Sequence, residues 1–98
     1  MDDIIKSRGE KVAPKEVEAL ISNMQGVKEC AVIGIDDAML GQAVKAFVVL
    51  EAGVTMTERL VMFACQSGLE NFKVPKFVEF VPELPRTSTG KVKRSDLS

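Results

Sequence analysis

A loop rich in hydroxyl groups precedes a lysine near the C-terminal end of the chain. Thr87, Ser88, Thr89 and Gly90 stand directly before Lys91. Hydroxyls, free backbone N–H groups and an ammonium together suit the oxygens of a phosphate or a carboxylate. Gly90 allows the sharp turn that projects the lysine outward, and the spacing is not that of a Walker A loop. From the residues alone, two interpretations stay open: a phosphate-contacting loop, or a solvated loop that begins a basic helix.

The N-terminal segment holds the second pattern with chemical potential. Ile4, Ile5 and Val12 flank a polar stretch that contains Gly9. Two apolar ends around a polar turn predict a short β-hairpin, and Gly9 supplies the positive φ that such turns often need. A charged hairpin at the start of a domain is usually a surface turn, so this segment does not establish a function by itself.

Residue usage excludes several kinds of chemistry. The chain has 98 residues and no histidine, which excludes a Ser-His-Asp triad, a Cys-His pair and an imidazole metal site. Cys30 and Cys65 are far apart and form no CxxC motif. They are therefore interpreted as buried, reduced thiols of a cytoplasmic protein rather than a disulfide or a metal site. The length fits a single domain, residues 1–98, that is too small for a deep internal cavity.

Charge is unevenly distributed along the chain. The net charge is −1, with seven basic and eleven acidic side chains in residues 1–70, and six basic and three acidic ones in residues 71–98. The basic C-terminal part is either a solvated tail or a surface that meets an anion such as phosphate. The overall charge is slightly acidic, so nucleic acid is not indicated as a partner. No apolar run is long enough to predict a transmembrane segment.

Periodicity and turn signals predict the elements that position the two segments. An apolar stripe at Val17, Leu20, Ile21 and Met24 predicts a helix that begins at Pro14. The further elements are strands at 27–35 and 44–50, a helix capped by Thr57 that runs to Leu69, a strand at 77–81 and a short final helix at 91–97. The near-continuous apolar run at 44–50 indicates a strand covered on both faces. Together they predict an α+β fold, a small antiparallel three-stranded sheet packed with helices plus an N-terminal β-hairpin.

Taken in order along the whole chain, these segments resemble the C-terminal domain of the adenylate-forming superfamily, which includes acyl-CoA synthetases, aryl-CoA ligases, luciferases and peptide-synthetase adenylation domains. The matching segments are residues 2–9 (DDIIKSRG), 12–18 (VAPKEVE), 32–37 (VIGIDD), 41–48 (GQAVKAFV), 72–76 (FKVPK) and 85–91 (PRTSTGK). Each segment is weakly specific alone, but their combination in register is specific.

The resemblance implies a two-step reaction. ATP and a carboxylic acid give an acyl-adenylate and pyrophosphate, and the thiol of CoA then displaces AMP. Between the steps the small domain rotates and presents a different face to one active site. Lys91 matches the lysine that serves adenylation, with residues 87–90 positioning it, and its ammonium would bridge the carboxylate and the α-phosphate. Acetylation of Lys91, a modification of the matching lysine in many relatives, would remove that charge.

The resemblance also implies roles for residues in the first hairpin and near the second helix. Asp2 matches the hinge residue, and Lys6 matches a lysine that assists the second half-reaction in some relatives. Arg8 and Gly9 lie in the loop that lines the pantetheine tunnel, where a glycine lets the thin pantetheine chain pass close to the backbone. An alternative for Lys6 is an exposed strand lysine.

Two neighbouring residues near the second helix match CoA-binding positions. Phe72 aligns with an aromatic that stacks on the CoA adenine in some ligases, and Lys73 or Lys76 would lie near the phosphates. A core role is the alternative for Phe72.

We therefore expect a fragment of an acid–thiol ligase, most similar to bacterial fatty-acyl or aryl-CoA synthetases and involved in fatty acid metabolism. Its partner would be a large N-terminal domain, which is absent from the chain and holds most of the ATP, Mg²⁺, CoA and carboxylic acid sites. The isolated domain is expected to be inactive and to bind none of these cofactors. Two alternatives remain: an adenylation domain that loads a carrier protein, and a stand-alone binding or regulatory module derived from this domain.

Overall fold

The fold was analysed in a computed structural model that describes residues 4–98, so the expected hinge residue Asp2 lies outside the described residues. The elements are β1 (Ile5–Ser7), β2 (Glu10–Val12), α1 (Pro14–Ser22), β3 (Val27–Asp37), β4 (Gly41–Leu50), α2 (Glu58–Gly68), η1 (Asn71–Lys73), β5 (Phe77–Phe80) and η2 (Arg94–Asp96). Both η elements are single 3₁₀ turns.

β4 is the central strand of the sheet. It pairs with β3 over nearly its whole length in antiparallel register, from Val27 opposite Leu50 to Asp37 opposite Gly41. On its other side it pairs with β5 and, through Ser7 opposite Gly41, with β1 of the hairpin. The predicted α+β class and the N-terminal hairpin are confirmed.

The expected sheet needs correction in two respects. The hairpin belongs to the same sheet, which therefore has five strands in the described part of the chain. β5 also runs parallel to β4, with Lys45 opposite Phe77 and Val48 opposite Phe80. The physical reason is the connection: β4 is followed by α2, which carries the chain back to the starting end of the strand, and such a crossover joins parallel strands.

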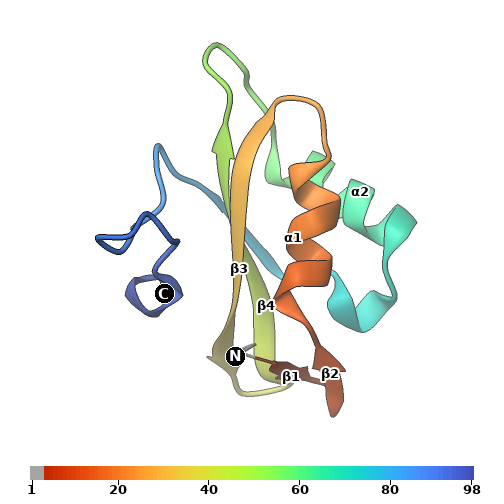
Figure 1. Ribbon diagram of the computed structural model, residues 1–98. Helices are drawn as coiled ribbons and strands as arrows, with labels where there is room; N and C mark the ends of the chain where they lie inside the picture. Colours follow the sequence, from red (N-terminus) through yellow and green to blue (C-terminus); the bar gives the residue numbers. More distant parts are fainter. Residues whose placement is uncertain (1–3) are drawn as a thin grey trace.

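Both helices lie on one face of the sheet (Figure 1). α1 begins at Pro14, whose fixed φ suits the first helical position. Val17 and Ile21 are fully buried against the sheet, while Leu20 and Met24 pack partly against the same core. The stripe predicted from the sequence is thus the face by which α1 is held.

α2 begins at a capping threonine and ends at a glycine that lies close to α1. The Thr57 hydroxyl accepts the Leu60 N–H at 3.2 Å and confirms the predicted cap. Gly68, in the last turn of α2, lies where a Cβ would stand 2.5 Å from Leu20 Cδ1 of α1. The glycine therefore allows close contact between α2 and α1.

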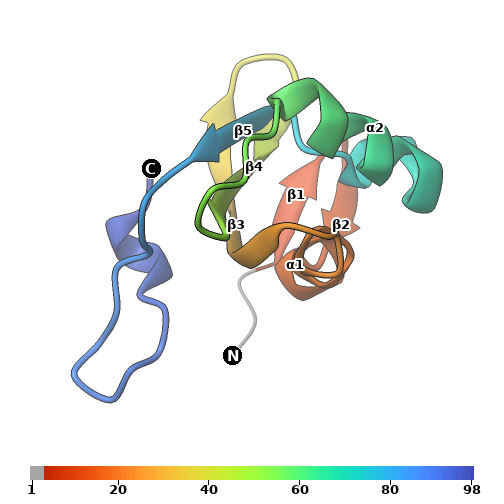
Figure 2. The ribbon, with the colours of Figure 1, turned by 90° about the horizontal axis from the view of Figure 1, so that it is seen from above.

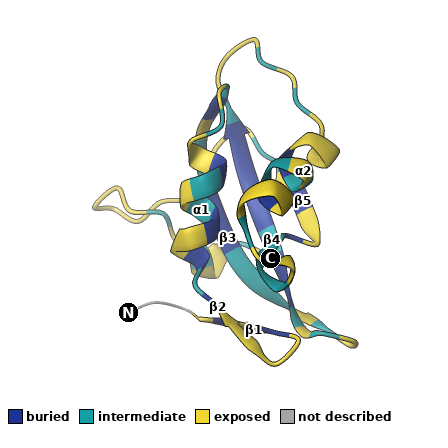
Figure 3. Cartoon of the chain, turned by 90° about the vertical axis from the view of Figure 1, so that its right-hand side faces the viewer, coloured by how far each residue is buried: buried dark blue, intermediate teal, exposed yellow. Residues whose placement is uncertain are grey.

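The opposite face of β4 is also covered, as the apolar run predicted. Val44, Ala46 and Val48 pack toward the helices, whereas Phe47 and Val49 belong to a second core cluster. Leu84, Val92 and Leu97 of the C-terminal segment, residues 81–98, close this second cluster. Figure 1 shows that segment on the far side of the sheet from α1 and α2, and Figure 3 shows β4 buried between them.

The predicted final helix at 91–97 is wrong. Only residues 94–96 form a helical turn, and Arg86 pairs with Val92 in an isolated antiparallel bridge. The apolar residues explain the difference, because Val92 and Leu97 both pack against the cluster around Phe47. A mostly non-helical backbone lets the side chains of Val92 and Leu97 both reach the sheet.

A carboxylate ties the two faces together at the edge of β3. The Glu18 side chain of α1 accepts the Val32 N–H at 2.7 Å. The same carboxylate receives the Arg94 guanidinium from η2, with N–O distances of 2.7–3.2 Å. Because β3 is an edge strand, this contact both satisfies a backbone N–H of the edge and fastens the C-terminal segment.

We expect Ile21→Ala to lower the free energy of unfolding by about 2–5 kcal/mol, because it removes a fully buried side chain and leaves a cavity between α1 and the sheet. Leu60→Ala on the exposed side of α2 is the control, with an expected change within about 0.5 kcal/mol. Urea unfolding of both variants measures the difference, and equal losses would contradict the assignment of the core.

Candidate functional site

The loop before Lys91 is a small closed turn with an exposed tip. The Thr87 N–H donates to the Lys91 carbonyl at 2.8 Å, and the Gly90 N–H donates to the Thr87 carbonyl at 2.9 Å. The Thr87 hydroxyl accepts the Lys91 N–H at 3.2 Å and lies 2.9 Å from the Thr89 hydroxyl. Gly90 has φ of +88°, the left-handed backbone that favours glycine. Of the loop residues predicted to position Lys91, Thr87 is therefore hydrogen-bonded to its backbone, and Thr89 contacts the Thr87 hydroxyl.

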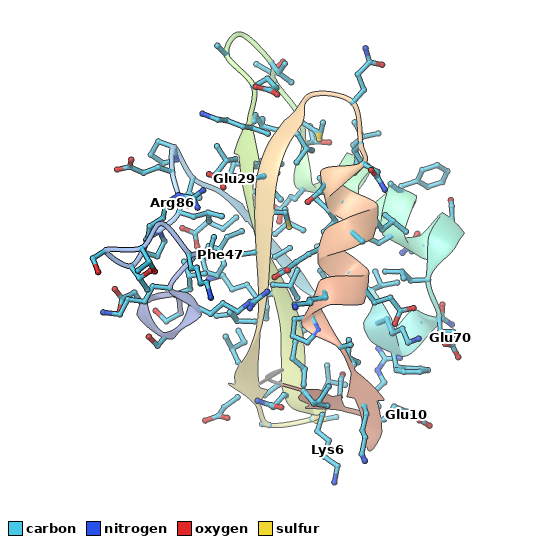
Figure 4. The ribbon with its side chains drawn as sticks, in the orientation of Figure 1. Lys6, Glu10, Glu29, Phe47, Glu70 and Arg86 are labelled. Atoms are coloured by element: carbon cyan, nitrogen blue, oxygen red, sulfur yellow. The ribbon has the colours of Figure 1, made fainter. Side chains whose placement is uncertain are left out.

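Two anchors hold this turn on the domain. Arg86 donates from one guanidinium nitrogen to the Gly90 carbonyl at 3.0 Å and from the other to the Glu29 carboxylate of β3. On the other side of the turn, Val92 packs into the cluster around Phe47. Figure 4 shows Arg86 beside Glu29, with the Phe47 side chain directed to the same side of the sheet.

The Lys91 side chain itself is exposed. Within residues 4–98, no carboxylate forms an ion pair with its ammonium, whereas Lys45, Lys73 and Lys76 each pair with an acid. An unpaired ammonium at the tip of an anchored turn is able to meet an anionic group supplied by another domain or by a ligand.

The hairpin turn has the geometry of a two-residue type I′ loop. Arg8 has φ of +55° and Gly9 has φ of +78°, and both must be positive in this turn type. The Arg8 N–H donates to the Leu40 carbonyl at 2.9 Å, and the Lys6 N–H donates to the Gln42 side chain at 2.8 Å. These bonds dock the hairpin on the β3–β4 connection and on the start of β4, and the side chains of Lys6 and Arg8 stay exposed.

A groove of about 480 Å³ joins the hairpin turn to the segment that follows α2. Its lining residues are Ser7, Arg8, Met39, Leu40, Val44, Gln66, Asn71, Phe72, Val74, Pro75 and Lys76. The groove thus brings together Arg8 and Phe72, two residues predicted to contact CoA. Phe72 is only partly buried and packs against the core.

The lysines near this groove already have acidic partners. The Lys73 ammonium lies 2.9 Å from Glu70 and 3.0 Å from Glu16, and its hydrogen bonds to these two carboxylates raise its pKa. The Lys76 ammonium lies 2.7 Å from Asp37, and this hydrogen bond lowers the pKa of the Asp37 carboxyl. A phosphate near Lys73 would compete with two carboxylates, so Arg8 is the better-exposed cation for that role, and the role predicted for Lys73 stays a prediction.

The Lys91 loop and the hairpin turn do not form one site. The loop projects from the C-terminal segment on one side of the sheet, while the hairpin lies at its far end beneath α1 (Figure 2). Figure 4 shows Lys6 and Arg86 at these separate places. Sequence reasoning missed the residues that hold the loop, Arg86 and Glu29, because no local pattern connects positions 57 residues apart.

Residues 16–91 match the family of the AMP-binding enzyme C-terminal domain. The chain belongs to this family. Its curated relatives include a 3-[(3aS,4S,7aS)-7a-methyl-1,5-dioxo-octahydro-1H-inden-4-yl]propanoyl:CoA ligase from Rhodococcus jostii, which is 43% identical over 97 residues. That match covers 99% of this chain and 19% of the relative. The chain thus spans about a fifth of the length of the ligases it matches.

Solved structures of two family members superpose on the chain closely. ATP-bound MatB from Rhodopseudomonas palustris is 42% identical, with a TM-score of 0.95 over 98% of this chain and 19% of the other. The amide bond synthetase McbA from Marinactinospora thermotolerans is 30% identical, with a TM-score of 0.95 and the same shares. The fold of this chain therefore also occurs in MatB and in McbA. In residues 4–98, no helix is long and apolar enough to cross a membrane.

The two thiols behave as core groups rather than nucleophiles. Burial raises the pKa of Cys30 from 9.0 to about 12 and that of Cys65 to about 11. Reactive cysteines have the opposite shift, because the thiolate is the attacking species. The structure describes both as free thiols, as expected from the sequence.

Cys65 is buried as expected, whereas Cys30 is only half-buried. We expect Ellman's reagent at pH 8 to label both thiols slowly in the folded chain and at once in 6 M guanidinium, because their raised pKa keeps them protonated in the folded chain. Above pH 9.0 the unfolded chain loses thiol protons that the folded chain keeps up to about 11–12. The stability contributed by the two thiols is therefore complete below pH 9 and declines above it. Labelling of the folded chain as fast as that of the unfolded chain would contradict the protection of the two thiols.

Proposed function

We propose that this chain is the mobile C-terminal domain of an AMP-forming acyl-CoA synthetase, and that Lys91 serves its first half-reaction. The observation that carries the proposal is the unpaired Lys91 ammonium on an anchored, exposed turn, in a chain that matches a CoA ligase over 99% of its length. The rest of the enzyme would be a larger domain, because the chain spans only 19% of that relative.

In the first step, a carboxylate oxygen attacks the α-phosphorus of ATP and pyrophosphate leaves. Two anions must approach each other, and the Lys91 ammonium placed between them would offset their repulsion in the transition state. Thr87 and Gly90 would contribute by fixing the direction of the lysine. The isolated domain would be inactive, because the grooves found within residues 4–98 are open to solvent and Lys91 stands on an exposed surface.

In the second step, the thiol of CoA attacks the acyl carbon and AMP leaves. The groove between Arg8 and Phe72 would bind part of the CoA molecule, with the Arg8 guanidinium directed to phosphate and Gly9 leaving room for the pantetheine chain. Lys6 would act near the same end of the domain. Since this end and the Lys91 loop lie apart on one domain, the domain would rotate between the steps about a hinge at Asp2.

ATP would enter as a substrate together with Mg²⁺, which prefers phosphate oxygens and a few carboxylates. The positively charged groups of the Lys91 loop fit a phosphate rather than a metal ion, so the larger domain would hold the metal.

In the full-length protein, Lys91→Ala should lower the rate of acyl-adenylate formation by roughly 10²- to 10³-fold, because it removes charge stabilisation of the transition state. ATP–pyrophosphate exchange with butyrate, octanoate and benzoate as probe acids first finds an active acid and then measures the loss. Lys91→Gln, which also mimics acetylation, should lose activity likewise.

Lys93→Ala is the matched control, since Lys93 is an exposed lysine two positions further along the same segment. It should keep adenylation within about threefold, the size expected of a surface substitution. Normal adenylation by Lys91→Ala, or an equal loss in Lys93→Ala, would contradict the role of Lys91.

Arg8→Asn should raise the KM for CoA by roughly tenfold or more, the effect of losing a charge-assisted hydrogen bond, and leave adenylation unchanged. Asparagine tolerates the positive φ at this turn, so the hairpin should persist. Thioester formation is measured with CoA and, separately, with a holo-carrier protein. An unchanged KM for CoA would remove Arg8 from the site, and a preference for the carrier protein would reassign the acceptor.

A further inference from the structure

The peptide unit that precedes Lys91 is held at both of its polar atoms. Its carbonyl, that of Gly90, accepts a hydrogen bond from Arg86 at 3.0 Å. Its N–H, that of Lys91, donates to the Thr87 hydroxyl at 3.2 Å. A peptide unit is planar, so bonds at both atoms fix the orientation of the whole plane. The plane in turn limits the direction in which the Lys91 side chain leaves the backbone.

Glu29 fixes the guanidinium that makes the first of these bonds. Its carboxylate pairs with the second terminal nitrogen of Arg86, and the ladder between β3 and β4 holds Glu29 opposite Val49. The side chains of Glu29 and Arg86 are 26% and 43% exposed. The pair is thus partly withdrawn from water and connects the turn to β3, which pairs with β4 over nearly its whole length.

We infer that Arg86 and Glu29 are positioning residues for Lys91, an inference that rests on the proposed role of Lys91 in adenylation. Arg86 is suited to this task because its planar guanidinium donates in two directions at once, to the Gly90 carbonyl and to Glu29. A lysine at position 86 would keep the charge without this fixed fork. The pair acts through the backbone of Lys91 and does not touch the reacting groups.

This role predicts a split between the two half-reactions. Only adenylation uses Lys91, so loss of the pair should impair adenylation and spare the transfer of the acyl group to CoA. A pair that merely stabilised the domain would affect both steps, because both need the folded domain. The split therefore separates positioning from stability.

The experiment compares Arg86→Ala, Arg86→Lys and Glu29→Ala in the full-length protein, each with and without Lys91→Ala. Adenylation is followed by ATP–pyrophosphate exchange with the active probe acid. Thioester formation is followed separately from the chemically synthesised acyl-adenylate of the same acid and CoA. We expect adenylation to fall roughly 10- to 100-fold in Arg86→Ala and Glu29→Ala, as for a displaced catalytic group, with thioester formation within twofold. Arg86→Lys should recover only part of the loss.

In the Lys91→Ala background, none of the three substitutions should lower adenylation further, because the positioned group is gone. The swapped variant Glu29→Arg/Arg86→Glu provides a second test. It restores an ion pair but sets a carboxylate against the Gly90 carbonyl, so adenylation should stay low.

Three results would overturn the inference: equal losses in both half-reactions, additive losses with Lys91→Ala, or recovery in the swapped variant. Normal adenylation in Arg86→Ala, with strong loss in Lys91→Ala, would also overturn it and leave the proposed function intact. Normal adenylation in Lys91→Ala would instead contradict the proposed function itself.

Discussion

The Glu18 carboxylate joins three parts of the molecule that lie far apart in the sequence. It belongs to α1, accepts the Val32 N–H at the edge of β3, and pairs with Arg94 of the C-terminal segment. Its side chain is only 15% exposed, so the pairing is partly shielded from water. α1 and the C-terminal segment cover opposite faces of the sheet (Figure 1). The Glu18 carboxylate therefore links the two coverings at the β3 edge of the sheet. The turn that carries Lys91 lies directly before Arg94 and depends on this attachment for its place.

That attachment also explains how a small domain presents two separate candidate surfaces. β4 is apolar on both faces and is covered by helices on one and by the C-terminal segment on the other. The helix side leads to the groove with Arg8 and Phe72, and the other side carries the Lys91 turn. The two surfaces therefore have a fixed spacing and cannot reach one point together, which fits a domain that serves two steps in turn.

Local features were predictable from the sequence because their physical causes are local. The positive φ at Gly9, the apolar stripe through Val17 and Ile21 and the Thr57 cap were all confirmed. The direction of β5, the irregular C-terminal segment and the Arg86–Glu29 pair were not predicted, because they arise from contacts between distant positions. The Glu18–Arg94 ion pair joins residues 76 positions apart, and the Glu29–Arg86 pair joins residues 57 positions apart. The choice of Lys91 as the chemical group came from the family resemblance, whereas the groups that hold it became visible only in the fold.

The proposed rotation of this domain relative to the larger domain is tested most directly by measuring a distance between the two domains. A spin label on a cysteine placed at exposed Ala52, paired with a label on the larger domain of the full-length protein, reports the orientation by pulsed electron paramagnetic resonance. Cys65 is buried and Cys30 is half-buried, and the raised pKa of both thiols should keep their labelling slow. With ATP and the active acid, one distance should dominate, and addition of CoA after adenylate formation should populate a second, distinct distance. One unchanged distance in both states would contradict the account of two surfaces used in turn.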